Sequence, residues 1–518
     1  MDVSLQGLLQ RAANLNPNGV CTRFGGREHS WKEVESRAAR LAGGLRGLGL
    51  ERGDRVAILS LNSDRYYECI FAIPWAGYCM VPLNTRWALP ENNYALSDSG
   101  TRVLLFDDAY SEQAGKLLFE VEDLSAAVYM GDGDCPEWAE SYEAMIVDSD
   151  PALPSRRGSD DMAGIFYTGG TTGFPKGVMQ SHRAFWASGL GAMPEFQMTR
   201  ESTYLHVAPM FHVADFAASM GTVLCAAESI ILPAFEPGDV LATFARERIS
   251  HVLMVPSMIK MLLSHPGVEQ ADVSSLEVLI YGASPMPVAV LERGMGLWPH
   301  VSFVQAYGQT ELAPVATMLS GKDHRIGGER LKSAGRPTTI NTIRIVGEDG
   351  EDCGLGESGE VVVRGPHTMI GYWNKAEETE RALRDGWVFT GDAGYFDEDG
   401  FLYIVDRVKD MVVTGGENVF TTEVENAVAQ HPAVQDVAVI GIPHEEWGES
   451  VHAIVILQAG AALTESELID HCRELIAGYK LPKSVSFRDQ PMPLSGAGKV
   501  LKTELRKPYW EGRDRQVN

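Results

Sequence analysis

Apolar and polar residues alternate along the first part of the chain in a way that predicts helices and strands in turn. Ser30 and Glu33 have the spacing of a capping box, and apolar residues follow them at helical intervals. The apolar run 56–59 predicts a buried strand, 67–77 predicts a helix, and 103–106 predicts a second strand. This alternation predicts a parallel sheet with helices on its faces.

The same alternation returns after the middle of the chain. Apolar runs predict strands at 229–232, 251–255, 278–281 and 302–306, and amphipathic stretches predict helices at 238–247, 256–263 and 287–297. The chain therefore contains two similar α/β halves.

From about residue 334 the pattern changes. Short strands at 343–346, 359–363 and 401–405, separated by turns of Gly and Asp, predict a small β-subdomain. A compact α+β tail follows, with a helix at 422–430, strands at 436–440 and 451–457, and a helix capped by Thr464 and Glu467. The predicted fold class is α/β. A large N-terminal domain, 1–407, contains the two halves and the β-subdomain, and a small α+β C-terminal domain covers 408–518.

The composition restricts the class of protein. A length of 518 residues is too large for one hydrophobic core, and 45% hydrophobic with 22% charged residues is typical of a globular protein. The chain opens without a basic and apolar leader, and Glu228 interrupts the longest apolar stretch, so we expect a cytoplasmic protein with no integral membrane segment.

The charge and the cysteines narrow the choice of partners. The formal net charge of −26 argues against nucleic acid as a partner and requires a locally basic site for any anionic ligand. The seven cysteines are scattered, without a Cys-x-x-Cys pair or a zinc spacing, and therefore read as reduced, mostly structural thiols.

The stretch from Tyr167 to Gly177 carries the first chemical signal. Its glycines allow backbone N–H groups to turn towards an anion, its threonines add hydroxyl donors, and Lys176 adds a positive charge. We expect a phosphate-binding loop. It is not a Walker A loop, because Pro175 precedes the lysine and a glycine follows it. On composition alone, an ordinary surface loop of Gly and Thr explains the stretch equally well.

Two further motifs follow predicted strands, where ligands bind in open α/β sheets. The small residues 282–284 allow a flat purine to lie against the backbone. In the stretch 305–311, Tyr307 offers an aromatic face for adenine, Thr310 offers a hydroxyl for phosphate, and Glu311 offers a carboxylate for Mg²⁺. Taken singly, the first is also typical of a strand-to-helix turn, and Glu311 of a helix N-terminus.

Two short stretches complete the series. Thr390-Gly391-Asp392 precedes a hairpin that ends in Asp406-Arg407, and the glycine-rich stretch 493–499 ends in Lys499. Taken singly, these are typical of a turn aspartate, a surface ion pair and a solvated lysine.

Together, the five motifs resemble in content and order the signatures of the acyl-adenylate-forming superfamily, which includes acyl-CoA synthetases, luciferases and peptide-synthetase adenylation domains. They span roughly residues 165 to 503. The resemblance implies an acid–CoA ligase that converts acid and ATP to acyl-AMP and pyrophosphate, and then acyl-AMP and CoA to acyl-CoA and AMP. Enzymes of this kind position reactants and offset charge, and no Ser/His/Asp or Cys/His pattern here demands a side-chain nucleophile.

The resemblance also assigns roles to individual residues. It implies an ATP phosphate loop of Thr168, Gly169, Gly170, Thr171, Thr172, Gly173 and Lys176. It implies an AMP site of Gly282, Ala283, Ser284, Ala306, Tyr307, Gly308, Asp392, Ile404 and Arg407, with Asp392 and Arg407 at the ribose. Catalytic roles fall to Lys499, Thr310, Glu311 and His212, with Glu311 holding Mg²⁺. A mobile C-terminal domain would rotate about Lys409 and present Gly415, Gly416 and Glu417 to CoA.

The acid pocket is expected near 209–216. His212 resembles the aromatic gate residue of acyl- and aryl-CoA ligases, whereas peptide-synthetase domains usually carry an aspartate there, so an α-amino acid is disfavoured. A satisfied structural histidine is the competing interpretation. The residues His212, Phe216, Met220, Ala313 and Pro314 would form the pocket and favour a hydrophobic acid, whether fatty, alicyclic or aromatic. Asp215 is unusual in such a lining: it either faces away or bonds a substrate hydroxyl.

Three alternatives share the motifs. The acyl group could pass to a carrier protein rather than CoA, or the fold could serve a luciferase-like oxygenase. A non-catalytic nucleotide sensor is disfavoured, because it would not need the full set of charged residues. The superfamily includes monomers and dimers, so the sequence leaves a homodimer open.

Overall fold

The computed structural model describes residues 3–168, 175–284, 286–407, 410–414, 417–444, 447–494 and 500–511. The chain divides into two compact units. The first contains residues 1–343 and 363–388, and the second contains residues 344–362 and 389–518.

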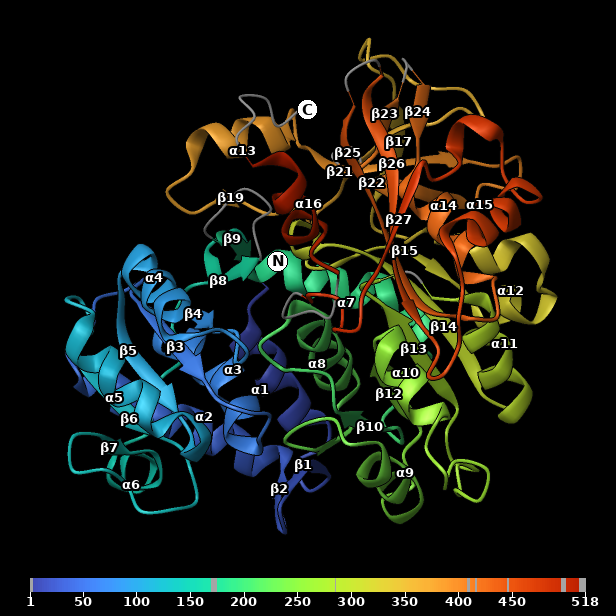
Figure 1. Ribbon diagram of the computed structural model, residues 1–518. Helices are drawn as coiled ribbons and strands as arrows, with labels where there is room; N and C mark the ends of the chain where they lie inside the picture. Colours follow the sequence, from blue (N-terminus) through green and yellow to red (C-terminus); the bar gives the residue numbers. More distant parts are fainter. Residues whose placement is uncertain are drawn as a thin grey trace. The chain divides into compact units, whose positions relative to one another are not determined.

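One sheet of the first unit has the strand order β19-β9-β8-β4-β3-β5-β6-β7 (Figure 1). Its strands are β3 (Arg55–Leu59), β4 (Cys79–Pro82), β5 (Thr101–Phe106), β6 (Ala126–Tyr129), β7 (Glu140–Ser141), β8 (Met162–Thr168), β9 (Lys176–Ser181) and β19 (Gly371–Tyr372). The associated helices are α1 (Leu5–Leu15), α2 (Trp31–Gly47), α3 (Asp64–Ala76), α4 (Leu89–Ser99), η1 (Asp108–Tyr110), α5 (Ser111–Glu120), α6 (Tyr142–Asp148) and α13 (Ala376–Ala382). The strands from β8 to β7 run parallel, and β9 is antiparallel to both β8 and β19.

The second sheet of this unit has the order β16-β15-β14-β13-β12-β10-β11-β1-β2. Its strands are β1 (Val20–Phe24), β2 (Arg27–Ser30), β10 (Thr203–His206), β11 (Glu228–Ile231), β12 (His251–Met254), β13 (Val278–Gly282), β14 (Ser302–Gly308), β15 (Val315–Leu319) and β16 (Arg336–Pro337). Its helices are α7 (His182–Phe196), α8 (Val213–Cys225), α9 (Pro237–Arg246), α10 (Pro256–Leu263), α11 (Val288–Leu297), η2 (Thr310–Leu312), α12 (Gly321–Ile326) and η3 (Gly328–Lys332).

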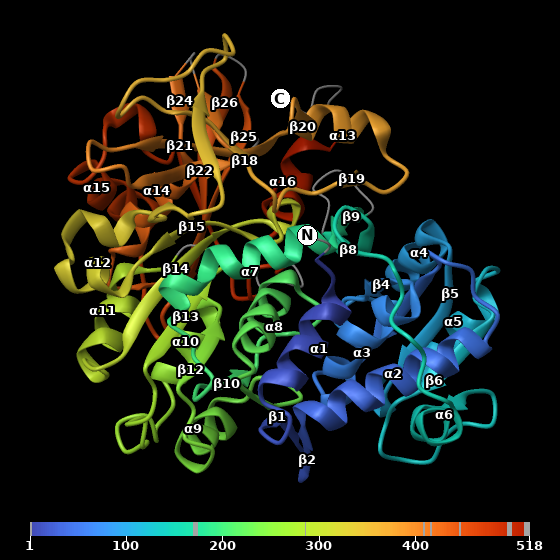
Figure 2. The ribbon, with the colours of Figure 1, turned by 180° about the vertical axis from the view of Figure 1, so that it is seen from behind.

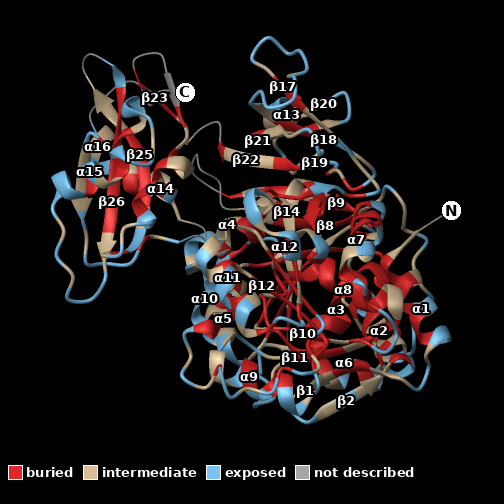
Figure 3. Cartoon of the chain, turned by 90° about the vertical axis from the view of Figure 1, so that its right-hand side faces the viewer, coloured by how far each residue is buried: buried red, intermediate tan, exposed pale blue. Residues whose placement is uncertain are grey.

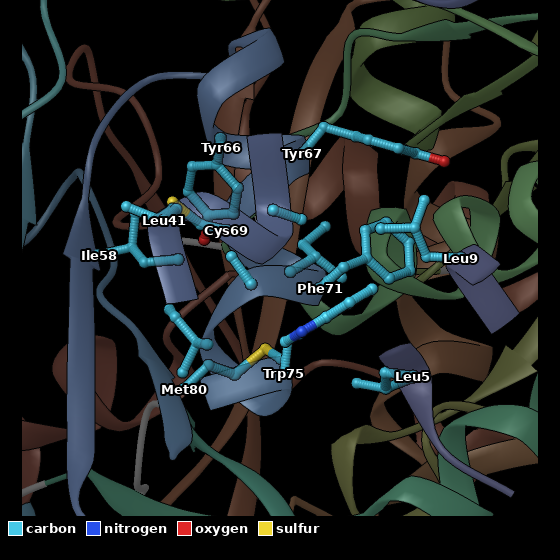
Figure 4. Packing of buried hydrophobic residues seen from close by; sticks show 14 of the residues in the cluster. Leu5, Leu9, Leu41, Ile58, Tyr66, Tyr67, Cys69, Phe71, Trp75 and Met80 are labelled. Atoms are coloured by element: carbon cyan, nitrogen blue, oxygen red, sulfur yellow. The ribbon is translucent and has the colours of Figure 1, made fainter. Parts of the chain in front are cut away.

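Helices α1, α2 and α3 form a large part of the core beside β3 and β4. Every residue of α3 is buried, and its side chains Tyr66, Phe71 and Trp75 belong to one core cluster with Leu9 of α1 and Met80 of β4 (Figure 4). Burying apolar area on this scale is the main favourable term in folding. The red colour of α3 and α8 in Figure 3 shows how completely both helices are enclosed.

Helices α7 and α8 lie side by side at the centre of the first unit (Figure 2). Phe185 of α7 and Phe216 of α8 belong to the core cluster that includes Phe166 of β8. Further along α7, Phe196 belongs to a second cluster that includes Ile280 of β13. The two helices therefore join the cores of both sheets.

Two small sheets lie wholly or mainly in the second unit, and β20 (Leu383–Arg384) of the first of them belongs to residues 363–388. In the first, β17 (Thr342–Val346), β18 (Gly359–Arg364), β21 (Trp387–Phe396) and β20 pair in that order, and β22 (Leu402–Arg407) joins β21. The second has the order β24-β23-β26-β25, with β27 beside β26, and its strands are β23 (Val412–Thr414), β24 (Glu417–Val419), β25 (Val434–His444), β26 (Gly448–Leu457) and β27 (Ser484–Phe487). Its helices are α14 (Thr421–Ala429), α15 (Glu465–Arg473), η4 (Gly478–Lys480) and α16 (Lys502–Trp510).

The predicted α/β class is confirmed, with its two sheet-bearing halves and a separate small C-terminal region. Both predicted capping boxes form, at Ser30–Glu33 and at Thr464–Glu467. One pairing was not predicted: β1 and β2, from the start of the chain, complete the sheet of the second half.

The predicted domain boundary stays a prediction. Contacts group the strands within 344–362 and 389–407 with the tail, whereas Lys409 falls outside the described residues. All seven cysteines are free, and Cys21, Cys69, Cys79 and Cys472 are buried. Within the described part of the chain, no helix is both long and apolar enough to cross a bilayer.

Candidate active site

The ends of the predicted phosphate loop form the base of a β-hairpin. Thr168, the last residue of β8, pairs with Lys176, the first residue of β9. The loop residues Gly169, Gly170, Thr171, Thr172 and Gly173 lie outside the described residues. The hairpin therefore places the loop at the end of β8, and Lys176 is partly exposed there.

The base of this hairpin is anchored from two directions. The Tyr167 hydroxyl donates to Oδ2 of Asp98 in α4 at 2.7 Å. The indole N–H of Trp373 donates to the backbone oxygen of Asp98 at 2.8 Å, and the Trp373 backbone N–H donates to Gly177 O at 2.8 Å. Burial, with the Asp98 charge beside it, raises the pKa of Tyr167, so its hydroxyl stays protonated and donates. The loop thus starts from a rigid support.

The two predicted purine-binding motifs lie on neighbouring strands. Gly282 at the end of β13 pairs with Ala306 in β14. A Cβ on Gly282 would lie 2.1 Å from Ala306 O, and a Cβ on Gly308 would lie 1.8 Å from Pro314 O, so both positions require glycine. The structure therefore brings together six predicted residues at the ends of the neighbouring strands β13 and β14. All are partly exposed: Gly282, Ala283, Ser284, Ala306, Tyr307 and Gly308.

Tyr281 has a structural role beside this edge. Its buried hydroxyl lies 2.8 Å from Nε2 of His324, whose Nδ1 lies 2.8 Å from Ser320 O. Burial lowers the pKa of His324 to about 4, so the ring is neutral near pH 7. Nδ1–H then donates to Ser320, and Nε2 accepts from Tyr281.

Glu311 follows β14 in the short helix η2, and side chains from distant segments hold it. Gln180 of β9 donates through Nε2 to Thr310 O at 2.5 Å. The Tyr372 hydroxyl of β19 donates to Oε1 of Glu311 at 2.8 Å, and Nζ of Lys176 lies 5.1 Å from the centroid of the Tyr372 ring. We call Lys176, Gln180, Thr310, Glu311 and Tyr372 the Glu311 cluster.

The Glu311 cluster suits a magnesium ion that arrives with a nucleotide. Mg²⁺ prefers oxygen ligands and is usually bound by one or two carboxylates together with substrate phosphates. Among the described residues there is no group of three or more His, Cys, Asp or Glu side chains that could hold a metal on its own. A single oriented, partly exposed carboxylate beside the base of a phosphate loop fits a site in which the protein and the substrate phosphates bind the metal together.

The loop before α8 carries His212 and is fixed by a residue from the other half. Asn62 accepts from the Met210 N–H at 2.8 Å and donates to Ala208 O at 2.9 Å. His212 is the N-cap of α8, and its Nδ1 accepts from the Ala214 N–H at 3.2 Å. Because Nδ1 is an acceptor, the proton of the neutral ring lies on Nε2.

The other residues predicted for the acid pocket differ in exposure. Pro314 is partly exposed, whereas Phe216, Met220 and Ala313 are at most 1% exposed. The Phe216 ring centroid lies 5.4 Å from that of Phe166 and 4.2 Å from that of Phe185. These buried side chains belong to the core, and their role as a pocket lining stays a prediction.

The structure resolves the question of Asp215. Its Oδ2 lies 2.7 Å from Nδ1 of His206, its Oδ1 accepts from the Tyr204 hydroxyl at 3.4 Å, and Nε2 of His206 lies 3.2 Å from the Ser229 hydroxyl oxygen. All four side chains are 0% exposed. Asp215 therefore faces the interior. We call Tyr204, His206, Asp215 and Ser229 the His206 cluster. It contains a Ser–His–Asp chain that the sequence did not reveal, but solvent cannot reach it.

The second unit carries the predicted ribose pair. Asp392 of β21 lies directly opposite Arg407 of β22, and Ile404 lies opposite Gly394. The side chain of Arg407 is outside the described residues. Lys409, Gly415, Gly416 and Lys499 are also outside them, and Glu417 is described only as backbone in β24.

A polar chain follows the predicted ribose pair within this unit. Asp406 accepts from both the backbone N–H and the hydroxyl of Thr421, at the first residue of α14. Lys502 of α16 lies 2.7 Å from Oε1 of Glu425 in α14 and donates to the Thr421 hydroxyl. The end of β22 is thus joined to two helices of the tail.

Several of these residues were not predicted from the sequence. Asn62, Gln180 and Tyr372 each contact a motif residue at least 61 positions away in the chain, so no local spacing marks them. The only sequence signal for Tyr372 is its place in a Gly-Tyr-Trp-Asn run that interrupts a polar segment.

Comparison with known families and proteins agrees with this arrangement. Residues 9–373 match the model of the AMP-binding enzyme family, and residues 423–499 match the AMP-binding enzyme C-terminal domain. A feruloyl-CoA synthase from Amycolatopsis sp is 38% identical over 509 residues, covering 96% of this chain and 98% of that protein. The medium/long-chain-fatty-acid–CoA ligase FadD8 of Mycobacterium tuberculosis is 37% identical, covering 94% of this chain and 86% of the ligase. The crystal structure of ATP-bound MatB from Rhodopseudomonas palustris superposes with a TM-score of 0.89 at 29% identity, covering 99% of each chain. The chain therefore belongs to the AMP-binding enzyme family.

Proposed function

We propose that this AMP-forming acid–CoA ligase activates a hydrophobic carboxylic acid. In the first step a carboxylate oxygen of the acid bonds to the α-phosphorus of ATP, and pyrophosphate leaves. In the second step the CoA sulfur, after losing its proton, bonds to the acyl carbon, and AMP leaves. The first step converts a delocalised carboxylate, which is a poor electrophile, into an acyl group with a good leaving group.

The observation that carries this proposal is the meeting of distant motifs at the strand ends of the first unit. The base of the phosphate loop at Lys176 and the oriented Glu311 carboxylate are far apart in the chain, and Tyr372 contacts both of them. Tyr307 lies on β14, the strand that precedes Glu311. A nucleotide needs an aromatic or flat surface for its base, N–H donors and a cation for its phosphates, and a carboxylate for its metal. The first unit offers candidates for all of these functions.

The chain's own residues would divide the first step between them. Lys176 and Thr168 would bind phosphate oxygens, Tyr307 would contact adenine, and Asp392 with Arg407 would bind the ribose hydroxyls. Lys499 would offset charge developing on the acid and the α-phosphate. Bound Mg²⁺, held by Glu311, would neutralise charge on the phosphates and favour departure of pyrophosphate.

The acid class rests on the loop of residues 209–213. Met210 and Phe211 are buried on it. The superfamily resemblance places His212 where peptide-synthetase domains usually carry an aspartate, which disfavours an α-amino acid. The names of the two similar ligases point to an aromatic acid and to fatty acids. We therefore propose an acid with a large apolar part. The Lys409 hinge, the rotation of the C-terminal domain, a cytoplasmic location and a homodimer remain expectations.

The test is incubation with ATP, Mg²⁺ and a panel of straight-chain, branched, alicyclic and aromatic acids, with and without CoA. Mass spectrometry would quantify AMP and the acyl thioester. The expected result is a thioester that forms only with CoA and with hydrophobic acids. Acyl-AMP that accumulates despite CoA would favour a carrier-protein acceptor, and no turnover with any acid would contradict the proposal.

A further inference from the structure

We infer that Tyr372 is a positioning residue for the metal–nucleotide complex, because it holds the Glu311 carboxylate and the Lys176 ammonium on one aromatic side chain. The inference rests on the proposed function, since it concerns how the same site binds ATP. Tyr372 is not part of any of the five motifs, and it lies 61 residues beyond Glu311 in the chain.

The first observation is the double contact itself. The Tyr372 hydroxyl donates to Oε1 of Glu311 at 2.8 Å, and Nζ of Lys176 lies 5.1 Å from the ring centroid of the same side chain. A cation within about 6 Å of an aromatic centroid is attracted by the ring quadrupole. Tyr372 therefore contacts both the Glu311 carboxylate, which is proposed to hold the metal, and the Lys176 ammonium, which is proposed to bind phosphate oxygens.

The second observation is that the backbone of Tyr372 is itself fixed. Strand β19 pairs with β9, and Tyr372 stands opposite Val178. The N–H of Tyr372 donates to the Thr379 hydroxyl at 2.9 Å, and the next N–H, of Trp373, donates to Gly177 O at 2.8 Å. Met369, at the start of the segment, donates its N–H to Glu311 O at 2.8 Å. The segment 369–373 thus ties the hairpin of the phosphate loop to the helix that carries Glu311.

The chemistry of the contact suits metal binding. A tyrosine hydroxyl can both donate and accept, and here it donates to the Glu311 carboxylate, which is acceptor-only when ionised. A carboxylate has about four lone-pair sites, so one hydrogen bond fixes its orientation and leaves capacity for a cation. Hydrogen bonds to a metal-binding carboxylate reduce the ordering that metal binding requires, and their loss typically costs about 10–100-fold in metal affinity.

Tyr372→Phe separates the two contacts, because it removes the hydroxyl and keeps the ring under Lys176. Isothermal titration calorimetry would measure binding of Mg–ATP, and of ATP in excess EDTA. We expect the affinity for Mg–ATP to fall about 10-fold, while the affinity for metal-free ATP changes less than about twofold. Tyr372→Leu also removes the ring, so its affinity for metal-free ATP should fall as well.

Tyr110→Phe is the matched control. It deletes a hydroxyl that donates to Thr85 O at 3.0 Å, a contact within the first unit that involves no predicted site residue. Its affinity for Mg–ATP should equal that of the wild type.

A double-mutant cycle with Glu311→Gln decides whether Tyr372 acts through Glu311. If it does, Tyr372→Phe should have no further effect on Mg–ATP affinity in the Glu311→Gln background. Additive losses, or unchanged Mg–ATP affinity in Tyr372→Phe, would overturn the inference. Absence of pyrophosphate exchange in the wild type would instead contradict the proposed function, and the calorimetric comparison would still judge Tyr372.

Discussion

The Glu311 cluster and the His206 cluster are two polar groups of the same unit with opposite degrees of access. Four members of the Glu311 cluster, Lys176, Thr310, Glu311 and Tyr372, are partly exposed at strand ends. The His206 cluster has the Ser–His–Asp arrangement of a hydrolytic triad, but every member is 0% exposed. A triad acts only if its serine reaches a substrate carbonyl. The two clusters are therefore distinguished by solvent exposure and by position in the fold, and not by the types of residue that they contain.

The same difference explains what each cluster contributes to the protein. A buried polar group without a hydrogen-bonding partner is costly, and Asp215 has its partners within the cluster. These partners join β10, β11 and the first turn of α8, next to His212. The His206 cluster should therefore govern stability, and the Glu311 cluster should govern chemistry.

The largest effect is expected for Asp215→Ala. Removing one partner of a buried pair typically costs about 3–5 kcal/mol of unfolding free energy, and here Nδ1 of His206 would be left buried without its partner. Asp215→Asn keeps an acceptor for His206 and should cost less. Urea unfolding of the full-length protein, followed by intrinsic fluorescence, would measure the loss of stability in both variants. A near-neutral Asp215→Ala would contradict the assignment of this cluster to stability.

Glu311→Gln should have the complementary effect. Loss of one charge-stabilising group typically lowers the rate about 10²–10³-fold. The rate of acid-dependent ATP–pyrophosphate exchange would report it, whereas the urea midpoint should stay near that of the wild type. If Glu311→Gln lowered the urea midpoint as strongly as it lowered pyrophosphate exchange, the Glu311 cluster would govern stability as the His206 cluster does.

The third prediction concerns the pH dependence of stability, which the buried histidines of the first unit should control. Burial lowers the pKa of His182, His251, His324 and His367 to about 4. An unfolded histidine titrates near 6.5, so the folded state loses stability as the pH falls from 6.5 towards 4. Each histidine should cost up to about 2 kcal/mol by pH 5. Urea unfolding at pH 7 and pH 5 would measure this loss of unfolding free energy. His324→Gln should make the loss smaller by the contribution of one histidine.

Ser229→Ala is expected to have the smallest effect. Its hydroxyl hydrogen-bonds the side-chain groups around it, including His206, and loss of such a contact typically costs about 1 kcal/mol of unfolding free energy. Thioester formation per folded molecule should be unchanged, and a fluorophosphonate probe should not label the wild-type serine. Loss of turnover in a folded Ser229→Ala protein would show that the buried chain participates in the reaction.

The sequence by itself determined the local structure and the order of the motifs. Ser30 with Glu33 predicted a helix start, and the capping box forms because both partners lie within one turn. The strands before the two purine-binding motifs were also predicted, since a buried parallel strand is a continuous apolar run. The phosphate-loop motif and the motif at 305–311 were recognisable because the residues of each are contiguous in the chain.

Only the tertiary structure decided which distant residues support those motifs. Tyr372 reaches Glu311 across 61 positions, and Asn62 reaches Met210 across 148, because strands and loops that are far apart in the chain become neighbours in space. The environment of Asp215 likewise depends on β10, β11 and α8 packing together. The sequence left open whether Asp215 faces away or bonds a substrate, and the packing places it in the interior. Local propensity depends on neighbours within a few residues, whereas burial and side-chain pairing depend on strand order, and strand order emerges only when the chain folds.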